Sequence, residues 1–474
     1  TCALPIYIFA LAPGALMIAE REGGTWKAHI ERKVRLRRSA PRLEWKGNFE
    51  EKSRELRAIL RVAVQSKLDS DVPLGAYLSG GIDSRIAAFE MGRIGARIET
   101  FTVGFESPDY DETADVQKFL TAYPNLHGRS LRLTDKSLEY SYPHAVYASE
   151  LVQPYTNGAA KWWLSRFARR YVRGVLTGDG ADELFCGYPS YRYLAWWNFY
   201  RRNPTTARAT LFSERMGIAK DKPWEKGLSS RPDGGDLIES EKQLGWAHPL
   251  YAQIDYTGRL WAGSRFAQTL QSEREDILSY IQPDSGKSPL TVWQNYFLHT
   301  HFPSHVLNWV GDRMEMANTL EGRPIFLSNS TREFFQSMPD HYLVRGMRDK
   351  AILRKAYAKE LGEFAATPKK QFNAPFLIDG ELGKYFLSTK NIQNAGIMDP
   401  AIVAMAQKRR GEAQNPLEKS FIEIFLQNCL VAHMLDLYLV RGKPPGRDLG
   451  REEKYLDDHL AERTTKRKTS RKGS

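Results

Sequence analysis

The chain has 474 residues, of which 42% are hydrophobic and 26% charged, and it carries a formal net charge of +12. That much apolar material is enough for the cores of two or three domains and excludes a mainly disordered protein. No run approaches the ~18 uninterrupted apolar residues of a membrane span. The start lacks the pattern of a signal peptide, and three scattered cysteines fit a reducing compartment, so we expect a cytoplasmic protein without membrane contact.

The positive charge is unevenly distributed. Residues 463–474 contain six basic and no acidic side chains, which is half of the net excess. This composition predicts a basic, disordered tail, which we place at residues 446–474. The charge therefore indicates a solvated tail and argues against a dedicated nucleic-acid site.

The N-terminal region looks like a fragment. The chain begins with Thr1 instead of Met, and we expect an incomplete reading frame. Apolar runs alternate with turn residues between Ile8 and Ile30, a pattern that predicts two strands joined by a hairpin. The basic, proline-containing residues 32–46 read as a linker, so the first predicted unit is residues 1–46 and the main one residues 47–445.

The next stretch alternates helices and strands. Apolar side chains recur every four residues from Phe49 to Ser70, as in an amphipathic helix. The predicted strands that follow are 75–78, 98–105, 130–133 and 174–176, and the predicted helices are 112–123, 137–151 and 159–171. This alternation predicts a parallel α/β sheet with ligands at the carboxyl ends of its strands.

A glycine-rich turn follows the first of these strands and reads Ser79-Gly80-Gly81, with Asp83 and Ser84 at the start of a helix. Glycines let a backbone approach a ligand closely, and a helix N-terminus attracts anions, so the turn suits a phosphate. Asp83 adds a carboxylate suited to a phosphate-bound Mg²⁺. Taken alone, such a turn is more often only a turn, and it matches neither of the common nucleotide-binding glycine motifs.

A second glycine-rich turn, Thr177 to Glu183, follows the strand 174–176 and contains Asp179 and Asp182. Acidic, glycine-rich turns are often plain surface loops or helix caps. Two such turns at strand ends of one α/β unit can instead converge on one Mg²⁺-polyphosphate, because this hard cation binds oxygen ligands and bridges phosphate oxygens.

The complete strings are more specific. Ser79 to Ser84 (SGGIDS) resembles the pyrophosphate loop of the N-type ATP pyrophosphatases. With Thr102 to Phe105 (TVGF), Thr177 to Tyr188 (TGDGADELFCGY), Asp312 to Leu327 (DRMEMANTLEGRPIFL) and Arg348 to Arg354 (RDKAILR), it is similar to the synthetase domain of glutamine-hydrolysing asparagine synthetases. The resemblance implies an adenine nucleotide alpha hydrolase-like fold, a parallel sheet with flanking helices, followed by a helical C-terminal portion.

The resemblance also implies roles for individual residues. The loop residues Ser79, Gly80, Gly81 and Ser84 would hold the pyrophosphate of ATP, and Asp83 and Asp182 would bind Mg²⁺. The nucleotide would be lined by Leu78, Val103, Thr177 and Gly178. Asp179 stands where the family has an acidic residue important for the acyl-adenylate, Lys350 matches a lysine that steadies phosphate charge, and Glu321 matches an acidic position near the acceptor. For Lys350 and Glu321, a surface ion pair is the alternative.

The implied reaction activates a small-molecule acid, aspartate first of all, with ATP and then transfers ammonia to it. In the full-length protein the ammonia would come from glutamine. Cys2 lacks the Cys-Gly-Ile context of the family's glutaminase nucleophile, and residues 8–35 resemble only the last strands of that domain. We therefore expect this chain not to hydrolyse glutamine. A homodimer is among the assemblies open to it.

Two departures from the family pattern lie toward the acceptor side: Ser328 follows Leu327 in place of an aspartate, and Lys370-Gln371-Phe372 lacks the family's glycine. Adenylation is thus better supported than aspartate as the acceptor. The alternatives are a β-lactam-forming or peptide-cyclising ligase, a sugar amidotransferase, and, from another class, a non-catalytic module that binds nucleotides or nucleic acid.

Overall fold

The structure is a computed structural model. It describes residues 15–32, 47–95, 97–192, 288–345, 348–368, 372–414 and 416–462, together with residues 11, 194, 195 and 264.

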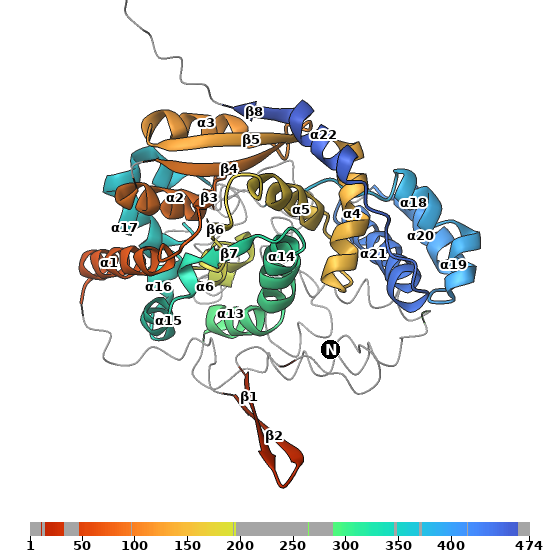
Figure 1. Ribbon diagram of the computed structural model, residues 1–474, viewed down its shortest axis with the longest axis horizontal. Helices are drawn as coiled ribbons and strands as arrows, with labels where there is room; N and C mark the ends of the chain where they lie inside the picture. Colours follow the sequence, from red (N-terminus) through yellow and green to blue (C-terminus); the bar gives the residue numbers. More distant parts are fainter. Residues whose placement is uncertain are drawn as a thin grey trace, which may run out of the picture.

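The centre of the molecule is a six-stranded sheet with the order β7-β6-β3-β4-β5-β8 (Figure 1). Its strands are β3 (Leu74–Tyr77), β4 (Ile98–Phe105), β5 (Leu126–Leu133), β6 (Gly174–Thr177), β7 (Glu321–Pro324) and β8 (Leu460–Glu462). The pairs from β7 to β5 are all parallel, and only the edge strand β8 runs antiparallel. The predicted parallel α/β sheet is confirmed, and β4 has the predicted bounds.

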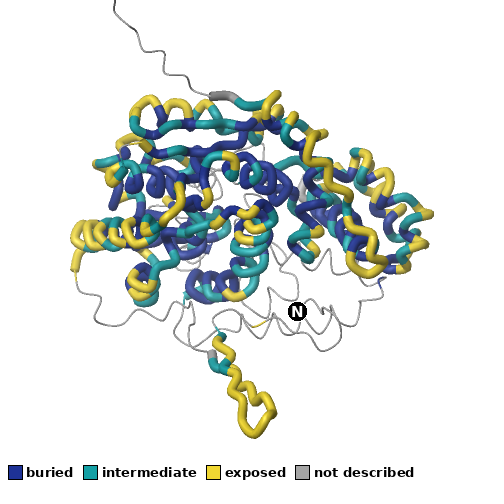
Figure 2. Tube along the Cα trace, in the orientation of Figure 1, coloured by how far each residue is buried: buried dark blue, intermediate teal, exposed yellow. Residues whose placement is uncertain are grey.

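Helices cover both faces of the sheet because successive strand residues point to opposite sides. Ala76 and Leu176 pack in a cluster with α1 (Phe49–Lys67), α2 (Ile82–Ile94) and α3 (Thr113–Ala122). Tyr77 and Val175, their neighbours in sequence, pack in a second cluster with α4 (Asp135–Ser149) and α5 (Asn157–Ala168). Figure 2 shows that the central strands β3, β4 and β6 and helix α5 are buried almost throughout, whereas the outer side of α1 is exposed.

The predicted helical C-terminal portion is also present. Its elements are α13 (Pro289–His299), the wide π-helical turns η1 (Phe302–Asp312), α14 (Arg313–Met316), η2 (Ile325–Leu327), α15 (Asn329–Gln336), α16 (Asp340–Leu343), α17 (Ala351–Leu361), η3 (Gly362–Ala366), α18 (Glu381–Phe386), α19 (Thr389–Ala395), α20 (Pro400–Glu412), α21 (Pro416–Leu435) and η4 (Asp436–Val440). The short helix α6 (Ala181–Leu184) follows β6. Residues 418–440 are long and apolar enough to cross a membrane, but 72% of that window is buried inside the protein, as in a core helix.

The predicted N-terminal hairpin is present as β1 (Ala15–Glu22) and β2 (Thr25–Arg32), which pair antiparallel. Figure 1 shows it projecting from the rest of the structure. Cys2 and the linker residues 33–46 lie outside the described residues.

The end of the described chain differs from the prediction of a disordered tail beginning at residue 446. Residues Leu449–His459 form helix α22, and β8 follows it and pairs with β5. The helix is held by charge, since Arg166 contacts both Glu452 at 3.1 Å and Glu453 at 2.6 Å. The prediction was wrong for residues 449–462 because it used only the local composition, which does not show that Glu452 and Glu453 have an ion-pair partner in Arg166. Residues 463–474 lie outside the described residues.

Replacing Leu456 with alanine should test how firmly α22 is attached. Leu456 is completely buried, so Leu456→Ala should lower the free energy of unfolding by about 2–5 kcal/mol, the usual cost of a cavity in a core. Leu449 lies on the same helix and is exposed, so Leu449→Ala should change it by less than about 0.5 kcal/mol. Urea denaturation measures both, and equal stabilities would show that α22 is not docked.

Candidate active site

The two glycine-rich turns meet at one edge of the sheet, because β3 and β6 are parallel neighbours and each turn follows one of them. Gly178 makes the close approach possible. A Cβ atom at this position would lie 2.8 Å from the Cβ of Asp83 and 3.0 Å from the backbone nitrogen of Ser84. Any larger residue would therefore push the second turn away from the start of α2, and the predicted convergence of the two turns is present.

The first turn is ordered by its own serines. The hydroxyls of Ser79 and Ser84 lie 2.9 Å apart, and the Ser79 hydroxyl accepts a hydrogen bond from the Gly81 amide at 3.2 Å. The Gly80 amide donates to the carboxylate of Glu112 at 3.0 Å. Glu112, which the sequence interpretation did not single out, thus supplies an anionic acceptor to the backbone of the proposed phosphate loop.

Lys350 brings the predicted charged residues together. Its ammonium lies 2.6 Å from Oδ1 of Asp182 and donates a hydrogen bond to Oδ2 of Asp83. The lysine is only 1% exposed, so it is no surface ion pair. Gly187 leaves room for this contact, because a Cβ there would overlap both the Asp182 carboxylate and the Lys350 side chain.

Asp83 and Asp182 form a donor set that fits a Mg²⁺ ion bound together with phosphates. Both carboxylates already contact one cationic group, and Mg²⁺ commonly takes only one or two protein carboxylates and completes its shell with phosphate oxygens and water. Among the described residues, no group of three or more histidine, cysteine, aspartate or glutamate side chains could hold a metal. A metal held by these two carboxylates would take its remaining ligands from phosphate oxygens and water.

The residues predicted to line the nucleotide lie beside the loop. Leu78 is buried, and its backbone carbonyl accepts a hydrogen bond from the Thr102 hydroxyl at 2.8 Å. Val103 is buried on the adjacent strand β4. The buried Thr177 hydroxyl has no hydrogen-bond partner within the described part of the chain. Such a group usually has a partner, so Thr177 is a candidate contact for a ligand.

A buried ion pair that the sequence interpretation missed lies near Asp179. Lys161 of α5 and Glu315 of α14 are 3.0 Å apart, and their side chains are 6% and 4% exposed. Burial raises the pKa of Glu315, the charge of Lys161 opposes this shift, and the charge of Asp179 adds to it. The Lys161 ammonium also lies 4.0 Å from the ring centre of Tyr77, the last residue of β3. Lys161 belongs to no motif, and Glu315 stands in the segment Asp312 to Leu327 at a position to which the resemblance assigns no role. The pair forms only in the folded chain.

Glu183, the residue after Asp182, is a buried acid. Burial first, and then the charge of Asp182, raises the pKa of Glu183 to about 8. The Tyr188 hydroxyl donates a hydrogen bond to its carboxyl group at 2.5 Å. Burial and the charge of Asp182 both favour the neutral form of the Glu183 carboxyl group, which adds no further negative charge beside Asp182.

Glu321 is the one predicted site residue that the structure does not place with the others. It begins β7 and aligns with Gly174, the first residue of β6, whereas the turns follow the opposite end of the strands. Its carboxylate is exposed and contacts Arg323 at 3.0 Å.

Glu321→Gln should therefore leave the catalytic rate within about threefold of the wild-type value, because an exposed ion pair of this kind contributes little. Steady-state kinetics of the variant measures this. A catalytic rate lowered a hundredfold or more would show that Glu321 takes part in the acceptor site.

The departure at Ser328 has a structural explanation. Ser328 is the N-cap of α15, and its hydroxyl accepts a hydrogen bond from the Thr331 amide at 3.2 Å. Aspartate and serine cap helices about equally well, so this position gives no evidence for a changed acceptor. Lys370 and Gln371, the second departure, lie outside the described residues.

Comparison with known proteins agrees with this geometry. Residues 55–425 match the asparagine synthase family. The chain is 27% identical to asparagine synthetase [glutamine-hydrolyzing] 1 of Bacillus subtilis over 67% of its own length and 48% of the relative. It is 28% identical to a putative asparagine synthetase of Mycobacterium tuberculosis over 74% of its own length and 53% of the relative. It is 25% identical to amidase chyE of Penicillium rubens over 76% of its own length and 59% of the relative.

The chain thus spans about half the length of the curated relatives it matches. Since the match covers most of the chain, including both turns and the Lys350 segment, the chain belongs to the asparagine synthase family.

Proposed function

We propose that the chain is an ATP-dependent amide-forming ligase, which converts a carboxylate into an acyl-adenylate, releases pyrophosphate and transfers ammonia to the acyl carbon. The observation that carries this proposal is the cluster of Lys350, Asp83 and Asp182 beside the glycine-rich loop at Ser79. It combines a buried cation with two carboxylates where a helix begins, which suits a magnesium-bound polyphosphate.

The chemistry explains why such a site is needed. A carboxylate is a poor electrophile because its leaving group would be oxide, so its oxygen first attacks the α-phosphorus of ATP, and the bond from this phosphorus to the pyrophosphate oxygen breaks. Negative charge then builds on the departing pyrophosphate. Lys350 would stabilise that charge, and Asp83 and Asp182 would hold a Mg²⁺ ion that neutralises part of it when bound.

In the second step the ammonia nitrogen attacks the acyl carbon, AMP leaves with the electrons of the broken carbon–oxygen bond, and the nitrogen loses a proton to give the amide. Water would compete with ammonia, so the acyl carbon has to be shielded. We propose that Asp179 contacts the acyl-adenylate. This residue is half-buried just after β6, and it lies near enough to the pair Lys161–Glu315 for its charge to raise the pKa of Glu315.

Aspartate is the first candidate acceptor, because the relatives from Bacillus and Mycobacterium are named asparagine synthetases. Two other relatives are named amidases, so the second candidate is a different acceptor acid, which would give a different amide. The same catalytic cluster would also serve a β-lactam-forming or peptide-cyclising ligase, in which an internal amine replaces ammonia.

Pyrophosphate release tests the proposal. The purified chain is incubated with ATP, Mg²⁺, ammonium and one acid at a time, from aspartate to amino-acid, peptide and sugar carboxylates, and pyrophosphate, AMP and amide are measured together. We expect equal amounts of the three with one acceptor class. Nucleotide binding without any acceptor-dependent pyrophosphate would instead indicate a non-catalytic binding module.

A further inference from the structure

Lys350 has an unusual backbone conformation. Its φ angle is 49°, in the left-handed region that non-glycine residues seldom adopt, and it forms the N-cap of α17. Such a conformation costs free energy and persists only where surrounding contacts fix it. Asp349 and Lys350 form a turn just before α17, which we call the lysine turn. The backbone amide of Lys350 donates a hydrogen bond to the carbonyl of Phe185 at 3.1 Å, which fixes one side of the lysine turn.

The other side of the turn is held by Arg354, one helical turn further along α17. Nη2 of Arg354 donates to the carboxylate of Asp349 at 2.6 Å, and Nε donates to the carboxylate and to the carbonyl of the same residue, both at 3.0 Å. Nη1 donates to the carbonyls of Ala365 and Thr367, both at 2.8 Å. All three guanidinium nitrogens therefore contact groups of the protein.

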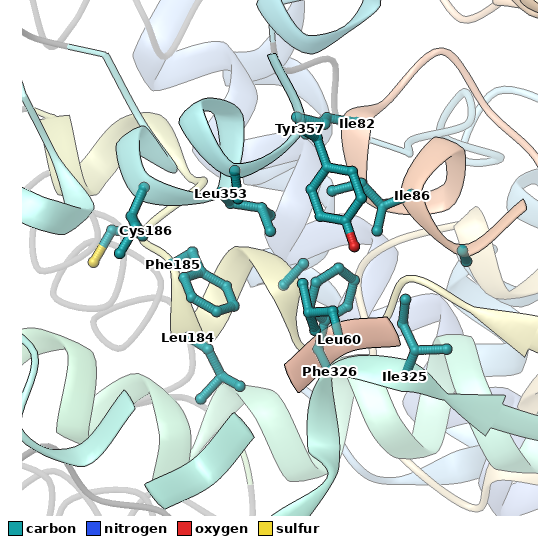
Figure 3. Packing of buried hydrophobic residues seen from close by; sticks show 14 of the residues in the cluster. Leu60, Ile82, Ile86, Leu184, Phe185, Cys186, Ile325, Phe326, Leu353 and Tyr357 are labelled. Carbon is teal, nitrogen blue, oxygen red and sulfur yellow. The ribbon is translucent and has the colours of Figure 1, made fainter. Parts of the chain in front are cut away.

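Thr367 connects this turn to the phosphate loop. Its hydroxyl accepts a hydrogen bond at 2.7 Å from Arg85, a buried arginine on α2 close to Asp83. Figure 3 shows Leu353 and Tyr357 of α17 in the same apolar cluster as Ile86 of α2. The segment that contains Thr367 is thus held by Arg354 from the lysine turn and by Arg85 from the loop helix.

We propose that Arg354 is a positioning residue of the active site, which acts with Asp349 to hold Lys350 in its left-handed conformation and its ammonium between Asp83 and Asp182. The kinetic tests of this inference measure pyrophosphate release and so rest on the proposed function. Its chemical test measures the reactivity of Lys350 and does not. Each guanidinium nitrogen of Arg354 already contacts a group of the protein, so we expect its effect on the reaction to pass through Lys350.

Arg354→Lys is the informative variant, because it keeps the positive charge but replaces a planar fork with a single ammonium that cannot make the same set of contacts. We expect the kcat of pyrophosphate release to fall about 10- to 100-fold, as for a misplaced catalytic group, with a change in the KM for ATP of less than about threefold. The matched control is Arg57→Lys, since Arg57 of α1 also contacts α17, through Glu360, but lies away from the lysine turn. It should keep the wild-type kcat.

A double-mutant cycle separates positioning from a general loss of order. If Arg354 acts through Lys350, then Arg354→Lys should have almost no further effect on kcat once Lys350 has been replaced with methionine. A loss by the same factor in both backgrounds would overturn the inference, and so would a wild-type kcat in Arg354→Lys alone.

The chemical test needs no catalytic activity. Acetic anhydride acylates lysines at rates that follow their accessibility, and mass spectrometry measures the rate at Lys350, with the buried Lys161 and the exposed Lys384 as references within the same protein. Lys350 should react at least about tenfold faster in Arg354→Lys than in the wild type, while Lys161 keeps its rate, because only the lysine turn has loosened. An unchanged Lys350 rate would show that Arg354 does not hold it. A faster rate in a chain that releases no pyrophosphate would support the positioning role and count against the proposed function.

Discussion

Asp83→Asn and Asp182→Asn are each expected to lower acceptor-dependent pyrophosphate release by about a thousandfold, the effect of removing one preorganised charge from a site that stabilises charge in the transition state. Asparagine has nearly the volume of aspartate, so little packing is lost. Each variant also leaves Lys350 one carboxylate partner, because its ammonium contacts both aspartates. The fold should therefore persist while the magnesium-binding charge is reduced.

The measurement is pyrophosphate release, paired with calorimetric unfolding of the same preparations. Asp109→Asn is the matched control, since Asp109 is an exposed aspartate in the turn after β4 and should keep full activity. Wild-type rates in Asp83→Asn and Asp182→Asn would remove both residues from the reaction. Inactive variants that were also largely unfolded would assign the aspartates a structural role.

Local sequence was sufficient to predict the two turns and four of the six sheet strands, β3 to β6, although β5 begins at Leu126 and not at the predicted residue 130. The strand β4 is rich in β-branched and aromatic residues, and each glycine-rich turn directly follows a short apolar strand. The strand ends and the ligand-binding backbone could therefore be inferred from neighbouring residues alone. Strands that alternate with helices form a parallel sheet, so the turns after β3 and β6 were expected at the same edge of the sheet, and the structure has them there.

What the sequence could not predict depends on contacts between distant residues. Lys161 and Glu315 are 154 positions apart, and nothing near either one indicates a buried partner. The strand β8 pairs with β5 although its surroundings are basic and polar. The position of Glu321, away from the other predicted site residues, could not be predicted either, because a motif match assigns a residue type to a position but not the direction in which its strand runs.

Lys350→Met should destabilise the protein as well as lower its kcat. Methionine is similar in length but carries no charge, so it leaves the carboxylates of Asp83 and Asp182 facing the same buried point without their cation. Removing one partner from a buried ion pair typically costs about 3–5 kcal/mol, and we expect a loss of this size in the free energy of unfolding. Lys355→Met, on the same helix, removes only an exposed ion pair with Glu50 and should leave the free energy of unfolding almost unchanged.

The conditions under which this loss shrinks identify its cause. Mg²⁺ together with a non-hydrolysable ATP analogue should stabilise Lys350→Met in proportion to its occupancy, since a cation at the same two carboxylates replaces part of the missing charge. Denaturation curves recorded with and without these additions measure this effect. A loss of stability that did not change with Mg²⁺ and the analogue would mean that the lysine contributes by packing alone, and the role of Asp83 and Asp182 as a shared cation site would then have to be abandoned.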